Sequence, residues 1–310
     1  MHDNANCLKW VPLAGKWSFE GETETYNEPE DPGTPYGLAL FPQPLRQGTG
    51  KVRARLHEPR EGAARVVFGF DPLTQNYYSA GIGGYSRAYV VDEFLAGRGW
   101  SALALQGSRA DLRSDEDISF EVEIRGQRAR LAVESVPVIE KNLPHPLTGD
   151  QVGIFTWGPA QVAFSAFSAD PLAPRAFVIM EFSEAFNSFF EHVVQPAAKK
   201  LGLDAFRASD VYKPGAILAD ILRDIVESEV IIAEITSANP NVFYALGHAH
   251  AMGKQTILLA DRATARLPFD ISGYRVIFYD NSIPGKPEVE RQLHEHLKSI
   301  MAETGRTAAP

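Results

Sequence analysis

The segment 230–254 constrains the fold of this 310-residue chain more than any other. It starts with an apolar run at 230–235, which predicts a buried β-strand, and continues through a polar loop that contains the pair Asn239 and Pro240. An apolar helix is expected at 244–252. Strand–loop–helix units of this kind build open α/β sheets, which bind ligands beyond the carboxyl ends of their strands.

The sequence on both sides of this unit extends the α/β pattern over the second half of the chain. Continuous apolar runs predict buried strands, and apolar residues at helical spacing predict amphipathic helices. The expected strands are 175–180, 230–235, 256–259 and 274–279, and the expected helices are 186–201, 217–226, 244–252 and 287–301. This alternation predicts a parallel sheet with helices on both faces.

The first half of the chain has the different rhythm of an all-β domain. Short segments that alternate apolar and polar residues are separated by Gly, Pro and Asp, which predicts an antiparallel β-sandwich. The clearest expected strands are 16–20, 51–56, 65–70, 118–124 and 128–133. A short helical turn is expected around 92–96. The glycine-rich segment 81–84 predicts a tight turn or bulge, because no helix follows it to make a phosphate loop.

The boundary between the halves is predicted at 170–174, where two prolines favour an extended connector. A chain of 310 residues is long enough for two domains that each bury their own core. We therefore expect a β-sandwich domain over 1–170 and an α/β domain over 171–310.

Composition limits the partners and the compartment that the chain is expected to have. The net charge of −9 and the lack of Lys/Arg runs argue against a nucleic-acid partner. No membrane span or signal peptide is recognisable, so a membrane partner is not expected. The single cysteine, Cys7, excludes a disulfide framework and a cysteine-based zinc site, which favours a cytoplasmic location without a bound metal.

Residues 239–247 read NPNVFYALG. This run resembles the motif N-P-N-V-x-Y-E-L-G of the nucleoside 2-deoxyribosyltransferase-like and Toll/interleukin-1-receptor-like N-glycosidases. The resemblance continues at 180–183, where Glu181 replaces the usual proline of M-P-F-S, and at 207–217, which is similar to R-A-D-D-x-x-x-P-G-x-I. It implies a flavodoxin-like sheet and chemistry at the N-glycosidic bond of a nucleoside or nucleotide. The family's catalytic glutamate falls on Ala245.

The resemblance and the position at the strand ends together predict substrate-binding residues on three loops and the following helix. These residues are Glu181, Phe182, Ser183, Asp210, Gly215, Ser237, Asn239, Asn241 and Tyr244. Several of them have a structural alternative. Ser183 and Asn239 are suited to cap the helices that follow them, Asp210 is suited to end a strand or start a turn, and Tyr244 is suited to core packing.

Alanine at position 245 removes the central group of the predicted chemistry. Cleavage of an N-glycosidic bond develops positive charge at the sugar carbon, which a carboxylate stabilises or captures as an ester. Three explanations stay open for Ala245: an engineered knockout, a natural pseudoenzyme that senses a nucleotide, and a catalytic acid displaced to another residue. Glu181, Glu184, Asp210 and Glu234 also lie at this edge of the sheet, but none of them matches the family position.

The function implied by the resemblance is cleavage of NAD or a related nucleotide, which is a substrate and not a cofactor. An appended β-sandwich favours a regulated immune (antiviral-type) effector, with the sandwich as a sensor or an assembly surface and with a homo-oligomer completing the site. The alternatives are a nucleoside deoxyribosyltransferase and a non-catalytic nucleotide-sensing protein with a lectin-like domain.

Residues 151–168 resemble the closing hairpin of concanavalin A-like jelly rolls, with a V-G-I-F-T strand, a Gly-Pro break and a second alternating strand. The resemblance implies a carbohydrate or protein ligand for the sandwich. Aromatic residues that either stack on a sugar ring or fill the sandwich core are Trp17, Tyr77, Tyr78, Tyr85, Trp100 and Trp157. A polysaccharide-cleaving sandwich would need paired carboxylates in one groove, whereas the acidic residues of 111–117 cluster in what is predicted to be a solvated loop.

Overall fold

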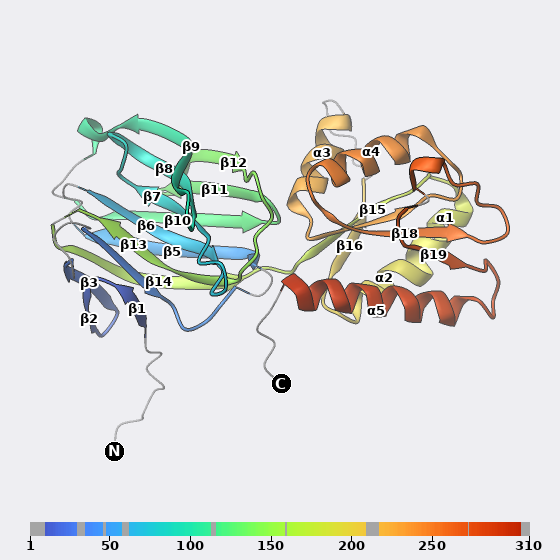
Figure 1. Cartoon of the computed structure of the whole chain (residues 1–310), viewed down its shortest axis with the longest axis horizontal. Helices are drawn as coiled ribbons and strands as arrows, with labels where there is room; N and C mark the ends of the chain where they lie inside the picture. The colour runs from blue at the N-terminus through green and yellow to red at the C-terminus, as the bar shows by residue number, and fades with distance from the viewer. Residues whose placement is uncertain are drawn as a thin grey trace, which may run out of the picture. The chain divides into compact units, whose positions relative to one another are not determined.

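The computed structural model describes residues 10–29, 35–45, 48–57, 62–112, 116–158, 160–208, 217–271 and 273–304. The chain forms two compact units, and the boundary along the sequence lies between Leu172 and Ala173 (Figure 1).

The first unit is a jelly-roll-like sandwich of two seven-stranded antiparallel sheets. The first sheet has the order β1 (Val11–Ala14), β4 (Tyr36–Leu40), β13 (Gln151–Trp157), β6 (Ala63–Phe70), β7 (Tyr77–Ile82), β8 (Arg87–Leu95) and β9 (Gly99–Ser108). The second has the order β12 (Val136–Asn142), β11 (Arg128–Val133), β10 (Ile118–Arg125), β5 (Gly50–His57), β14 (Val162–Pro171), β3 (Thr23–Glu28) and β2 (Lys16–Glu20). The predicted β-sandwich is therefore confirmed.

Strand alternation explains how the sandwich core forms. In the β5–β10 pair, Val52 lies opposite Val122 and Ala54 lies opposite Phe120, so that the inward side chains of both strands meet on one face. These residues are buried in one continuous core cluster. The outward residues between them are mostly charged, as expected for a sheet with one solvated face.

The first sheet is apolar on both faces, unlike a simple sandwich sheet. Val66 and Phe68 of β6 pack in the core between the sheets, whereas Val67 faces the other way. On that outer face Val67 packs with Tyr77 and Phe155 in a separate cluster, which also includes Trp100 at its edge. This outer aromatic layer shapes the cavity described below.

The helical turn predicted around 92–96 is wrong. Residues up to Leu95 belong to β8, which pairs with β7 on one side and β9 on the other. The β8–β9 register shifts between Val91 and Asp92. The extra residue of this bulge lies in β9, and β8 instead carries apolar residues on both faces, with Val91 in the core between the sheets and Phe94 in the outer cluster. The sequence of β8 therefore lacks the apolar–polar alternation that identifies a strand, which explains the wrong prediction.

The second unit contains a five-stranded parallel sheet. Its strands lie in the order β16 (Asp204–Arg207), β15 (Arg175–Ile179), β17 (Val230–Glu234), β18 (Gln255–Asp261) and β19 (Val276–Tyr279). Counted along the chain, this order is 2-1-3-4-5, so the winding direction reverses between β15 and β17.

Helices cover both faces of this sheet, as predicted. The helices are α1 (Glu184–Phe189), α2 (Gln195–Lys199), α3 (Ile217–Glu227), α4 (Pro240–Ala251) and α5 (Lys286–Thr304). One buried cluster joins Val178 of β15 to the helices α2 and α5, and another joins its neighbour Phe177 to α3 and α4 (Figure 1). Adjacent residues of a strand point to opposite faces, which is why a continuous apolar run is needed here.

Two helices differ in detail from the prediction. The expected helix 186–201 is interrupted by a π-helical turn (Phe190–Val194) between α1 and α2. Pro196 lacks the N–H that an α-helix would donate to the carbonyl of His192, and a π-turn accommodates this loss. Helix α4 starts at Pro240, four residues before the expected apolar segment 244–252, and Asn239 caps it as its structural alternative predicted, by accepting a hydrogen bond from the Asn241 amide at 2.9 Å.

Candidate functional site

A cavity of about 590 Å³ lies at the carboxyl ends of β15 and β17, where the winding of the sheet reverses. This is the position at which open α/β sheets bind ligands. The segment after β15 contributes Glu181 and Phe182, and α3 contributes Leu218 and Ile221. Helix α4 and its cap contribute Asn239, Asn241, Tyr244 and Ala245.

Ala245 forms part of the wall of this cavity and is itself 4% exposed. It packs in the cluster that joins α4 to Phe177 and Ile179 of β15. The residue that aligns with the glutamate of the N-glycosidase motif therefore lies next to this cavity. A longer side chain at this position would extend from an apolar wall, where burial strengthens electrostatic effects.

Polar and aromatic groups surround the cavity. Asn239 donates a hydrogen bond from Nδ2 to Glu181 Oε2 at 3.4 Å, which links the loops that follow β15 and β17. Tyr244 is 59% exposed, so it does not pack in the core as its structural alternative assumed. Phe182 is also exposed, and the guanidinium of Arg207 lies 5.4 Å from its ring centroid. Exposed rings beside amide and carboxyl groups suit a ligand that has both a flat base and a polar sugar.

Two other predicted residues, Ser183 and Ser237, are not among the residues that line the cavity. Ser183 caps α1 by accepting a hydrogen bond from the Phe186 amide at 3.4 Å, which is its structural alternative. Ser237 is exposed in the turn before α4 and is not among the residues that line the cavity. Asp210 and Gly215 lie outside the described residues.

Glu234, the last residue of β17, is fully buried at the same edge of the sheet. Its carboxylate accepts hydrogen bonds from the Thr236 hydroxyl and from Tyr279 Oη, the latter at 3.1 Å. Burial raises the pKa of Glu234 to about 7, since the loss of hydration outweighs the hydrogen bonds that favour the charged form. Glu234 is therefore a titrating group near neutral pH that does not line the cavity.

We expect Glu234→Gln to change how the stability of the α/β unit depends on pH. A pKa raised from 4.5 to about 7 means that the folded protein holds this proton more tightly than the unfolded chain. The contribution of Glu234 to the free energy of unfolding is then fully present below about pH 4.5 and is lost as the pH rises through about 7. The loss amounts to at most about 3 kcal/mol. The variant should match the unaltered protein near pH 5 and be more stable near pH 8, on the order of 1–3 kcal/mol.

Far-UV circular dichroism during urea unfolding measures this difference, because the α-helices of the described residues lie in the α/β unit. The glutamine retains an oxygen for Thr236 and Tyr279 and removes only the ionisation. Parallel stability curves for the two proteins across this pH range would contradict the assignment.

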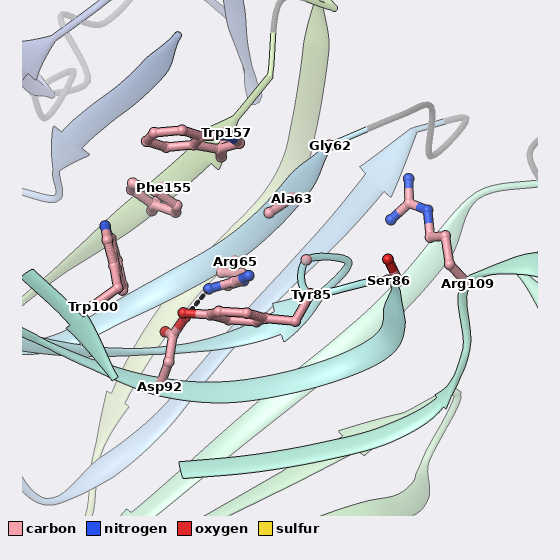
Figure 2. Close-up of a pocket in the computed structure, with 11 residues that line it drawn as sticks. Gly62, Ala63, Arg65, Tyr85, Ser86, Asp92, Trp100, Arg109, Phe155 and Trp157 are labelled. Carbon is pink, nitrogen blue, oxygen red and sulfur yellow. Dashed lines mark hydrogen bonds and ion pairs between the residues drawn. The ribbon is translucent and has the colours of Figure 1, made fainter. Parts of the chain in front are cut away.

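A second cavity, of about 560 Å³, lies on the outer face of the first sandwich sheet. In the view of Figure 2, Trp157, Phe155 and Trp100 lie on one side, Arg109 lies on the other, and Arg65 and Asp92 lie between them. The sequence analysis named three of the four aromatic residues of the described lining, Tyr85, Trp100 and Trp157, but none of its three charged residues as part of a site. Arg65 and Asp92 lie on different strands, and no local motif brings them together.

Comparisons with known proteins find fold similarity over about half of the chain. No family model and no curated protein matches it. A carbohydrate-binding module from Bacillus subtilis is 15% identical with a TM-score of 0.45, and the match covers 53% of this chain and 97% of that one. A Bacillus subtilis protein of unknown function with a galectin-like fold is 13% identical with a TM-score of 0.40, covering 52% and 88%. At these values the matches carry no information about a ligand, and the likeness to N-glycosidases depends on sequence motifs alone.

The described residues contain no group of three or more His, Cys, Asp or Glu placed to hold a metal ion. None of the helices in this described part is both long and apolar enough to cross a membrane.

Proposed function

We propose that the α/β unit binds NAD or a related nucleotide in the cavity at the carboxyl edge of its sheet. We also propose that this unit is an N-glycosidase domain in which alanine occupies the catalytic position. The observation that carries the proposal is the placement of Ala245 in the cavity wall beside Asn239, Asn241 and Tyr244 of the same motif. The strand order 2-1-3-4-5 supports a flavodoxin-like sheet.

The geometry suits a nucleotide in three respects. The exposed rings of Phe182 and Tyr244 offer faces on which a base stacks. The side chains of Asn241 and Glu181 offer hydrogen-bonding groups for ribose hydroxyls. The start of α4 places the positive end of the helix dipole at the cavity, where it favours an anionic group.

The chain with Ala245 binds without cleaving under this proposal. Departure of the base takes the electron pair of the C–N bond and leaves positive charge on the sugar, which alanine neither stabilises nor captures. The described lining of the cavity contains one carboxylate, that of Glu181, and it accepts a hydrogen bond from Asn239. This favours a nucleotide-sensing role for the chain in its Ala245 form.

Titration calorimetry of the full chain with NAD, AMP and deoxyadenosine tests the binding. We expect one of these compounds to bind and Asn241→Ala to weaken its binding about 3- to 10-fold, as expected for one lost hydrogen bond. Asn281→Ala is the matched control, because Asn281 is exposed in the loop after β19 and does not line the cavity. No binding of any of the three, or equal weakening by both variants, would contradict the proposal.

A further inference from the structure

The cavity of the sandwich is formed by side chains that the sheet register brings together. Phe155 of β13 lies opposite Arg65 of β6, and Ser79 of β7 lies opposite Asp92 of β8. Trp157 follows Phe155 at a spacing of two and therefore lies on the same face of β13. Strands distant in sequence thus place aromatic and charged residues around one hollow on the outer face of the sheet.

The floor of this hollow is a buried and fully connected ion pair. Arg65 is 4% exposed and forms a salt bridge through Nη1 with Asp92, which is 0% exposed. Arg65 also donates from Nε and Nη2 to the Gly83 carbonyl at 3.1 and 2.8 Å. Asp92 accepts further hydrogen bonds from Ser79 Oγ at 2.5 Å and Tyr85 Oη at 3.3 Å. The charges of the pair neutralise each other, and their geometry is fixed before any ligand arrives.

The backbone of the turn between β7 and β8 leaves room for the Arg65 side chain of this ion pair. A side-chain carbon at Gly84, whose φ is +112°, would lie 1.9 Å from Arg65 Nη2. The next two residues, Tyr85 and Ser86, have φ values of 51° and 57°, which is unusual for residues other than glycine. Such a backbone places the Tyr85 ring, 46% exposed, over the Arg65 guanidinium at 5.7 Å. Uncommon backbone conformations of this kind concentrate at ligand sites.

Aromatic rings form the walls of the cavity. Trp157 and Tyr85 are 45% and 46% exposed, so a large part of each ring is open to solvent. Trp100 and Phe155 continue the apolar wall towards the Arg65 guanidinium, at 6.0 Å from each ring centroid. Flat apolar walls around a small set of fixed polar groups are the usual makeup of a small-molecule site, and about 560 Å³ is a usual volume.

We propose that this cavity binds one ring of a neutral saccharide. The apolar face of the sugar ring packs on Trp157 and Tyr85, and a ring hydroxyl forms a hydrogen bond with the exposed Ser86 hydroxyl. The ion pair itself gives a phosphorylated ligand no uncompensated charge, because Arg65 is already paired with Asp92. Arg109, the other cationic side chain in the described lining, also has an interaction partner within the protein.

Tryptophan fluorescence provides a direct readout of this site. All four tryptophans of the chain, Trp10, Trp17, Trp100 and Trp157, lie in the sandwich unit, and two of them line the cavity. The full chain is titrated with neutral oligosaccharides built from glucose, mannose, galactose, fructose and arabinose. Oligogalacturonate and AMP are the acidic comparators.

We expect at least one neutral oligosaccharide to bind at millimolar concentration or below. Trp157→Ala should weaken its binding at least about tenfold and Trp157→Phe less, because phenylalanine keeps a smaller ring. Phe19→Ala is the matched control: Phe19 is a partly exposed ring on β2 of the other sheet and should change the affinity by less than about twofold. Calorimetry repeats the comparison, because Trp157 is itself a source of the fluorescence signal.

Three results would overturn this proposal. One is the absence of binding by every neutral oligosaccharide, and another is equal affinity of the unaltered protein and Trp157→Ala. The third is binding of oligogalacturonate or AMP alone at this site, which would assign an anionic ligand. Each leaves the nucleotide proposal standing, because that cavity belongs to the other unit.

Discussion

With glutamate in place of Ala245, the protein is expected to release the base of the nucleotide bound in the α/β cavity at least about 100-fold faster than the unaltered chain. This factor is the lower end of the rate enhancement that one positioned acid–base side chain provides. Ala245 lies in the second turn of α4 and in the cavity wall, so a longer side chain there extends towards the ligand. Its carboxylate supplies the charge that stabilises the sugar cation, or the oxygen that forms a glycosyl ester which water then hydrolyses.

Ala245→Gln separates charge from size in this experiment. Glutamine has the length and shape of glutamate but no negative charge, so the glutamine variant should bind the nucleotide and release no base. Chromatography of free base after incubation with NAD, nucleoside monophosphates and deoxynucleosides measures the outcome and identifies the substrate class. If the glutamate and glutamine variants both bind and neither releases base, the domain is a binding module and the N-glycosidase interpretation is wrong.

The α/β fold was predictable because its determinants are local. A strand buried on both faces needs an uninterrupted apolar run, such as 230–233, and this run is bounded by Glu229 on one side and by Glu234 and a polar loop on the other. The pair Asn239 and Pro240 marks the start of α4 by capping chemistry alone. The π-helical turn at 190–194 was missed because the side-chain periodicity stays helical through it, while Pro196 changes only the backbone hydrogen bonds.

The two cavities differ in how far the sequence predicts them. Asn239, Asn241, Tyr244 and Ala245 belong to one short motif, so a single segment names much of the α/β site. The sandwich site depends instead on strand register, which no local pattern reports. Asp92 was assigned to a turn, because β8 carries apolar residues on both faces and shows no clear apolar–polar alternation.

Asp92→Ala is expected to lower the free energy of unfolding of the sandwich by about 3–5 kcal/mol, the usual cost of removing one partner of a buried ion pair. The substitution leaves the guanidinium of Arg65, 4% exposed, without its anion, and it removes the acceptor of Ser79 and Tyr85. Urea unfolding followed by tryptophan fluorescence measures the loss in this unit alone, because it contains all four tryptophans.

Two further variants determine whether the unpaired charge causes that loss. The double variant Arg65→Met with Asp92→Ala leaves no charge buried, so it should be less destabilised than Asp92→Ala alone. Glu28→Ala breaks an exposed pair, since Lys16 and Glu28 have side chains that are 62% and 59% exposed, and it should cost less than about 1 kcal/mol. A double variant as unstable as the single one would mean that the pair stabilises the sheet by packing. In that case the hydrogen bonds from Arg65 to the Gly83 carbonyl, and not its salt bridge with Asp92, fix the position of the guanidinium in the saccharide cavity.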